Sequence, residues 1–121
     1  MNLIKNNELI AEFMGLQKSR PEIQEFVNEP EKNGLYYERT KGVHEYLSYH
    51  KSWNWLMPVV IKLEQLKHPV HISSNNCSIY YSTNAIQNNE YIVDIYGENK
   101  MDAVYRAVVT FIKYLNIQKN E

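Results

Sequence analysis

The hydrophobic and polar residues of this chain change their spacing along its length, and each change predicts a different kind of element. Apolar residues recur at helical spacing over 2–14, and Gly15 follows where a helix would end. A second start signal over 19–27, with Ser19 as N-cap of a capping box, predicts a short helix. The next patterned segment, 35–40, is typical of a short edge strand or an extended segment.

A long helical pattern follows from Val43 to about Leu66. It contains Pro58, which has no backbone N–H to donate and whose ring crowds the carbonyl of Asn54. Two interpretations stay open: the helix kinks at Pro58, or one helix ends near Met57 and another begins with Pro58 in its first turn.

The spacing then becomes that of strands. Residues 69–74, 77–82 and 90–96 are rich in β-branched and aromatic side chains, and Asn-rich turns separate them. Such short connections favour an antiparallel meander. The last pattern, 99–118, predicts a helix that Asn99 caps. Its buried face is expected to hold Met101, Val104, Tyr105, Val108, Phe111, Ile112 and Leu115.

These elements predict one α+β domain over residues 1–121. Its small antiparallel sheet of three to four strands would be packed with helices, like an α-β-α sandwich, and would end in a long C-terminal helix. A chain of 121 residues with 44% hydrophobic content can build one such core. Neither an internal repeat nor a linker divides it.

Charge and composition narrow the classes of function. With 13 basic and 14 acidic residues the net charge is -1, which does not favour binding to duplex nucleic acid or to a membrane surface. The sequence has no apolar run that predicts a signal peptide or a transmembrane helix. Its only cysteine, Cys77, fits a reducing compartment. We therefore expect a cytoplasmic protein.

Catalytic and metal-binding patterns are weak. His68 and His71 are three residues apart, but a zinc site needs about four ligands and no cysteine or carboxylate cluster accompanies them. Cys77 at the start of a strand is more typical of a small buried hydrophobe than of a nucleophile. With four glycines, no phosphate-binding loop is found. We expect no catalytic residue, metal or cofactor.

Aromatic residues are the more informative feature. Trp53 and Trp55 are two positions apart, so on a helix they point to opposite sides, and we expect one inside and one at a rim or interface. Exposed rings favour a protein interface or stacking on a planar ligand, although ordinary packing and AT-rich codon usage explain the excess equally well. Arg106 and Lys113, or Arg39 and Lys51, would complement an anion. The predicted ligand-binding residues are Tyr46, Tyr49, His50, Trp53, Trp55, Tyr81 and Arg106.

Four segments, in this order, resemble small phage and prophage proteins of Bacteroidetes, the family called phage ABA-sandwich domain. They are NNELIAEFMGLQ near the start, SWNWLMPVVIKLEQL in the middle, CSIYYS on a strand and MDAVYRAVVTFIKYLN at the end. The resemblance spans nearly the whole chain, but these are packing motifs and bring no catalytic residues. It implies a sheet sandwiched by helices, and a phage-derived accessory protein in a bacterial cytoplasm that binds a host factor, blunts a defence system or sequesters a signalling molecule.

Several hypotheses of function follow. The first is a non-catalytic, homo-oligomeric binding protein that captures a host protein or a small planar ligand such as a nucleotide messenger. The alternatives are a nucleic-acid-associated phage protein, which the near-neutral charge disfavours, a small enzyme that uses Cys77 or a histidine, and a structural dimer without a ligand.

Overall fold

The computed structural model describes residues 3–18, 36–40 and 43–119. Its elements, in chain order, are α1 (Leu3–Phe13), β1 (Gln17–Lys18), β2 (Tyr36–Thr40), β3 (Val43–Tyr46), α3 (Trp53–Gln65), β4 (Val70–Ile72), β5 (Asn76–Tyr80), the 3-10 turn η2 (Asn84–Ile86), β6 (Tyr91–Tyr96) and α4 (Lys100–Lys119). The helix predicted over 19–27 lies outside the described residues.

The predicted α+β class, the antiparallel meander and the long C-terminal helix are confirmed. Strands β4, β5 and β6 form one sheet in that order, with Cys77 opposite both Ile72 and Ile95. A second small sheet has the order β1-β2-β3. Both sheets are antiparallel between neighbouring strands, as their short connections require.

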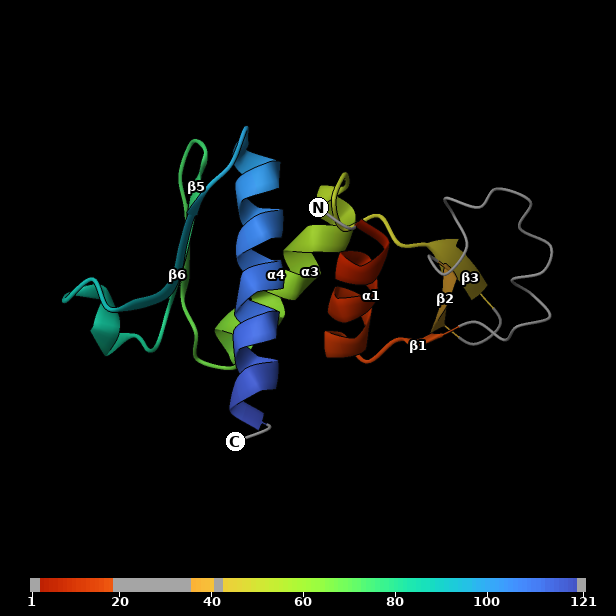
Figure 1. Ribbon diagram of the computed structural model, residues 1–121, viewed down its shortest axis with the longest axis horizontal. Coiled ribbons are helices and arrows are strands. Elements are labelled where there is room, and N and C mark those ends of the chain that lie inside the picture. Colours follow the sequence, from red (N-terminus) through yellow and green to blue (C-terminus); the bar gives the residue numbers. More distant parts are fainter. Residues whose placement is uncertain (1–2, 19–35, 41–42, 120–121) are drawn as a thin grey trace.

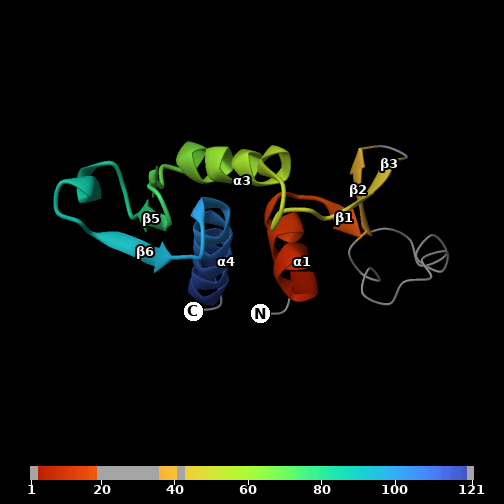
Figure 2. The ribbon, with the colours of Figure 1, turned by 90° about the horizontal axis from the view of Figure 1, so that it is seen from above.

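The helices lie between the two sheets (Figures 1 and 2). Helix α4 packs on β5 and β6, α1 lies beside α4, and α3 crosses behind both. His71, Asp94 and Tyr96 are exposed strand residues of the first sheet. In the described part of the chain, the helices therefore pack against one face of this sheet rather than against both.

Residues 43–46 correct the predicted long helix. They form β3, which pairs with β2 through Tyr36 opposite Tyr46, and helix α3 begins only at Trp53. A strand partner that the local sequence does not reveal overrides the helical spacing here. Helix α3 then continues through Pro58 to Gln65, so the prediction of a helix that ends near Met57 is wrong.

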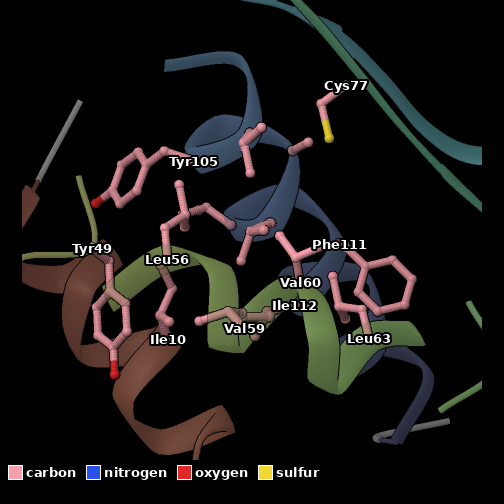
Figure 3. Packing of buried hydrophobic residues seen from close by; sticks show 14 of the residues in the cluster. Ile10, Tyr49, Leu56, Val59, Val60, Leu63, Cys77, Tyr105, Phe111 and Ile112 are labelled. Carbon is pink, nitrogen blue, oxygen red and sulfur yellow. The ribbon is translucent and has the colours of Figure 1, made fainter. Parts of the chain in front are cut away.

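The core lies where α1, α3 and α4 meet the sheet (Figure 3). The predicted face of α4 is confirmed: Val104, Tyr105, Val108, Phe111 and Ile112 are buried, and Met101 and Leu115 pack against them partly buried. Helix α3 contributes Leu56, Val59, Val60 and Leu63. Asn99 caps α4 as predicted, because its Oδ1 accepts a 2.9 Å hydrogen bond from the Asp102 N–H.

Candidate functional site

A groove runs along the exposed side of α4, with β6 on one side and α1 on the other. Helix α4 contributes a stripe at the spacing i, i+3, i+4, i+7, which places four side chains on one face over two turns. We call it the cationic groove, with a volume of about 530 Å³; its residues are Lys5, Asn6, Leu9, Ile95, Tyr96, Arg106, Val109, Thr110 and Lys113.

Three cations line the cationic groove, and no carboxylate is among its described lining residues. Arg106 and Lys113 are seven positions apart on one helix, which separates their Cα atoms by about 10 Å along its axis. Lys5 reaches the groove from α1. Leu9, Ile95 and Val109 supply apolar lining, so the groove offers both charge and a dry surface.

Arg106 is held in place by Asp102. Its Nε donates to both carboxylate oxygens of Asp102 at 2.9 Å, and Asp102 Oδ2 also accepts the Glu98 N–H at 2.8 Å. Burial alone would raise the pKa of Asp102, but the Glu98 N–H and Arg106 together hold this pKa below its ordinary value. The ion pair occupies only Nε, which leaves the terminal guanidinium nitrogens to donate to a ligand.

Tyr96 supplies an aromatic ring at the rim of the cationic groove. It is the last residue of β6, its side chain is 70% exposed, and it lines the groove next to Ile95. An exposed phenol ring beside cationic side chains is a suitable platform for stacking a planar anionic group.

A second hollow, of about 380 Å³, lies at the start of α4 and includes His50, Lys51 and Glu98. Beneath it a polar chain joins three segments: the Tyr105 hydroxyl donates to Asn7 Oδ1 at 2.9 Å, and Asn7 Nδ2 lies 2.9 Å from His50 Nδ1. Asn7 and Tyr105 are buried, and burial raises the pKa of the Tyr105 phenol. These hydrogen bonds position α1 against α4 and so support the groove between the two helices.

A third hollow, of about 610 Å³, lies near the C-terminal end of α4 and mixes charges of both signs. Its Lys62 already donates to the Phe13 carbonyl, and its ammonium lies 4.5 Å from the centre of the Phe13 ring. Glu12 adds a negative charge to the same lining. This hollow is therefore a poorer site for an anion than the cationic groove.

The structure does not bring the seven predicted residues together. Arg106 lines the cationic groove, and His50 lines the neighbouring hollow. Tyr81 is 49% exposed, lies between β5 and η2, and lines neither of these hollows. The side chain of Tyr46 lies outside the described residues.

Tyr49, Trp53 and Trp55 belong to the core and its margin rather than to an open binding surface. Tyr49 is buried, and its ring packs edge-on against Trp55 with 5.1 Å between centroids. Both tryptophans are half-buried against the core. The expected division into one inner and one outer indole is wrong, because both rings are partly buried and both pack against the core.

Sequence reasoning missed Lys5 and Tyr96 as groove residues, while it named Lys113 as a cation that would complement an anion. The local sequence holds a signal for α4 alone, since Arg106, Thr110 and Lys113 fall on one helical face. Lys5 and Tyr96 join them only through the packing of α1 and β6 on α4.

Cys77 is fully buried on β5, as the sequence predicts for a structural residue. Burial, with a smaller contribution from Asp94, raises the pKa of its thiol to about 12, which leaves almost no thiolate at neutral pH. On the same strand Ser78 donates to Asp94 Oδ1 at 2.6 Å. His71 lies opposite Ser78, but Asp94 contacts the serine rather than the histidine, so these residues do not form a Ser-His-Asp relay.

Within residues 3–18, 36–40 and 43–119, no group of three or more His, Cys, Asp or Glu side chains is placed to hold a metal ion. No helix in these ranges has the length and hydropathy needed to cross a bilayer. In comparisons with known proteins, no family model, curated protein or solved structure matches the chain.

Proposed function

We propose that this chain is a non-catalytic binding protein that captures a planar anionic small molecule, of the nucleotide class, in the cationic groove. The observation that carries the proposal is the convergence of Lys5, Arg106 and Lys113 on one groove without a carboxylate in its lining. The phosphate of a nucleotide would pair with these cations, and its base would stack on Tyr96.

The dimensions of the groove favour a small ligand. Its volume of about 530 Å³ lies in the range typical of sites for small molecules. The spacing of Arg106 and Lys113, about 10 Å along α4, suits a ligand whose negative groups are held apart, such as a cyclic dinucleotide with two separate phosphates. With a net charge of -1, the chain as a whole does not attract anions, so the attraction of a phosphate would come from local cations such as those of the groove.

The resemblance to phage ABA-sandwich proteins supports a particular setting for this activity. A phage accessory protein that holds a nucleotide messenger would lower the free concentration of the messenger in a bacterial cytoplasm and so blunt a defence response. Capture without turnover requires only affinity and abundance.

Isothermal titration calorimetry with matched variants tests the proposal. Nucleoside mono-, di- and triphosphates and cyclic dinucleotides are titrated at low salt, and the corresponding nucleosides serve as controls without phosphate. We expect Arg106→Gln and Lys113→Gln each to weaken binding about tenfold or more, because each removes a charged hydrogen bond. Lys100→Gln removes the same charge from α4 outside the groove and should leave the affinity unchanged.

The dependence of binding on salt gives a second readout, because ion pairs with a phosphate weaken as ionic strength rises. The wild-type affinity should fall with added salt, and it should fall less steeply in Arg106→Gln. If no phosphate-containing compound binds, or if both groove variants bind like the wild type, the proposal is wrong.

A further inference from the structure

Strand β6 is an open edge of its sheet. Among the strands that the structure describes, it pairs only with β5 in the order β4-β5-β6, and with six residues it is twice as long as β4 at the other edge. An open strand edge presents unpaired N–H and C=O groups that can pair with another strand.

The pairing with β5 identifies which main-chain groups face this edge. The Gly97 N–H donates to the Asn75 carbonyl at 2.8 Å, so residue 97 turns its main chain toward β5. Because antiparallel strands alternate in this respect, Val93 and Ile95 also turn toward β5, opposite Ile79 and Cys77. The N–H and C=O groups of Asp94 and Tyr96 therefore face the open edge.

Features that usually keep an edge strand from pairing with another chain are weak at the C-terminal end of β6. The strand Tyr91–Tyr96 contains neither lysine nor proline. Its one charged residue, Asp94, is held over β5, where its Oδ1 accepts from Ser78 at 2.6 Å and from Asn76 at 2.9 Å. The pairing with β5 is irregular at the start of β6, between the pairs that hold Tyr91 and Val93, which leaves Val93–Tyr96 as the regular edge.

We propose that the β6 edges of two copies of this chain pair antiparallel about a twofold axis at Ile95, with Asp94 of each copy opposite Tyr96 of the other. Twofold symmetry pairs only residues that point to the same face, which limits the choice of register. A register centred on Asp94 would oppose two carboxylates, and one centred on Val93 would involve the irregular start of the strand.

The Ile95-centred register is complementary in both main chain and side chains. Asp94 and Tyr96 exchange their edge N–H and C=O groups, which makes four hydrogen bonds in the pair of chains. Tyr96 is 70% exposed, and its hydroxyl makes no hydrogen bond in the described part of the chain. In the pair it lies beside the carboxylate of Asp94 from the other copy. The result is a six-stranded sheet with both α4 helices on the same face, so the cationic grooves of the two copies, which β6 borders, adjoin across the twofold axis.

Disulfide trapping tests the register. In the Ile95-centred pair the two Ile95 residues are a non-hydrogen-bonded pair with Cα atoms about 4.5 Å apart, within the span of a disulfide. Ile95→Cys should give a covalent dimer under mild oxidation. Tyr96→Cys, which faces Asp94 rather than itself, should not, and the buried Cys77 provides an internal thiol that stays out of the reaction. Equal cross-linking of both variants, or none in Ile95→Cys, overturns the register.

Sedimentation velocity tests the pairing itself. Tyr96→Pro removes an edge N–H without removing a bond to β5, so the chain should fold by circular dichroism and yet lose at least tenfold in dimer affinity. Tyr91→Lys places a charge on the same strand outside the paired segment and should dimerise like the wild type. A wild-type chain that stays monomeric at about 100 µM, whether or not it takes up an extended peptide instead, overturns the proposal.

Discussion

Tyr105 and Asn7, 98 positions apart in the sequence, are joined by a buried hydrogen bond of 2.9 Å from the phenol hydroxyl to the amide oxygen. The bond ties α1 to α4, the two helices that carry the cations of the groove. Asn7 also donates its Nδ2 hydrogen toward His50 Nδ1, so one amide links three segments. The position of Lys5 relative to Arg106 depends on this link.

A double-mutant cycle measures the strength of the link. Tyr105→Phe leaves the buried Asn7 oxygen without its donor, and we expect a loss of about 1–2 kcal/mol in the free energy of unfolding. Asn7→Ala leaves the buried Tyr105 hydroxyl without a partner and should cost about 2–3 kcal/mol. Urea denaturation of both single variants and the double variant should give a coupling energy of about 1 kcal/mol, whereas strictly additive losses would contradict the bond.

The same polar chain predicts a dependence of stability on pH. Burial, and then the adjacent Lys51 ammonium, lower the pKa of His50 below its ordinary value of 6.5. Just below pH 6.5 the unfolded chain therefore binds more protons than the folded chain. The contribution of His50 to the free energy of unfolding is therefore complete above pH 6.5, and it declines as the pH falls toward the lowered pKa. In the hollow His50 faces Lys51, Glu98 and Asp102.

Unfolding experiments at pH 7.5 and pH 5.5 check this prediction. The wild-type chain should lose more stability between these two values than His50→Ala, because the variant lacks the group that titrates. Asp94 and Asp102 have pKa values lowered from 3.8, so their effects fall below this pH range. A loss of equal size in the two proteins would show that His50 does not contribute.

Gly97 permits the close approach of β6 to the first turns of α4. A Cβ at this position would lie 2.4 Å from the Ala103 amide nitrogen and 2.8 Å from the Ala103 Cα, both of which are backbone atoms of a helix. Gly97→Ala should therefore cost about 2–3 kcal/mol in the free energy of unfolding, since the strand or the helix has to move.

Gly15→Ala is the matched control for this substitution. Gly15 ends α1 with φ +81°, and nothing lies within 4 Å of a Cβ built there, so the cost arises from the backbone conformation alone. We expect about 1 kcal/mol. In thermal unfolding followed by circular dichroism, Gly97→Ala should have a lower melting temperature than Gly15→Ala. The reverse order would mean that the approach of β6 to α4 is not tight.

The sequence correctly predicted the elements whose structure follows from the spacing of apolar residues within the segment itself. The face of α4, its Asn99 cap and the three strands between α3 and α4 all follow from period and turn chemistry within the segment. Residues 43–46 were predicted wrongly as helix because their structure is set by pairing with β2, which a helical window does not include.

The candidate site was only partly predictable for the same reason. Arg106 and Lys113 share a helical face that the sequence displays, whereas Lys5 and Tyr96 reach the groove through the packing of α1 and β6 on α4. The sequence analysis predicted too many exposed aromatic rings, because Tyr49 and Trp55 pack edge to face against each other. Counting rings in a sequence does not show which of them pack together.

Pro58 lies in the interior of α3, and this position predicts that replacing the proline will stabilise the chain. Helix α3 begins at Trp53, so Pro58 is beyond the first turn, where a missing N–H would cost nothing. The carbonyl of Asn54 has no N–H to accept from at residue 58. Pro58 is exposed, so its replacement disturbs no buried contact. Pro58→Ala should therefore stabilise the chain by about 2 kcal/mol, the helical gain less the entropy that proline removes from the unfolded state. Met57→Ala, one residue earlier at an exposed position, restores no hydrogen bond and should change the stability little. Urea denaturation midpoints measure both, and a Pro58→Ala chain no more stable than the wild type would show that α3 already relieves the proline by bending.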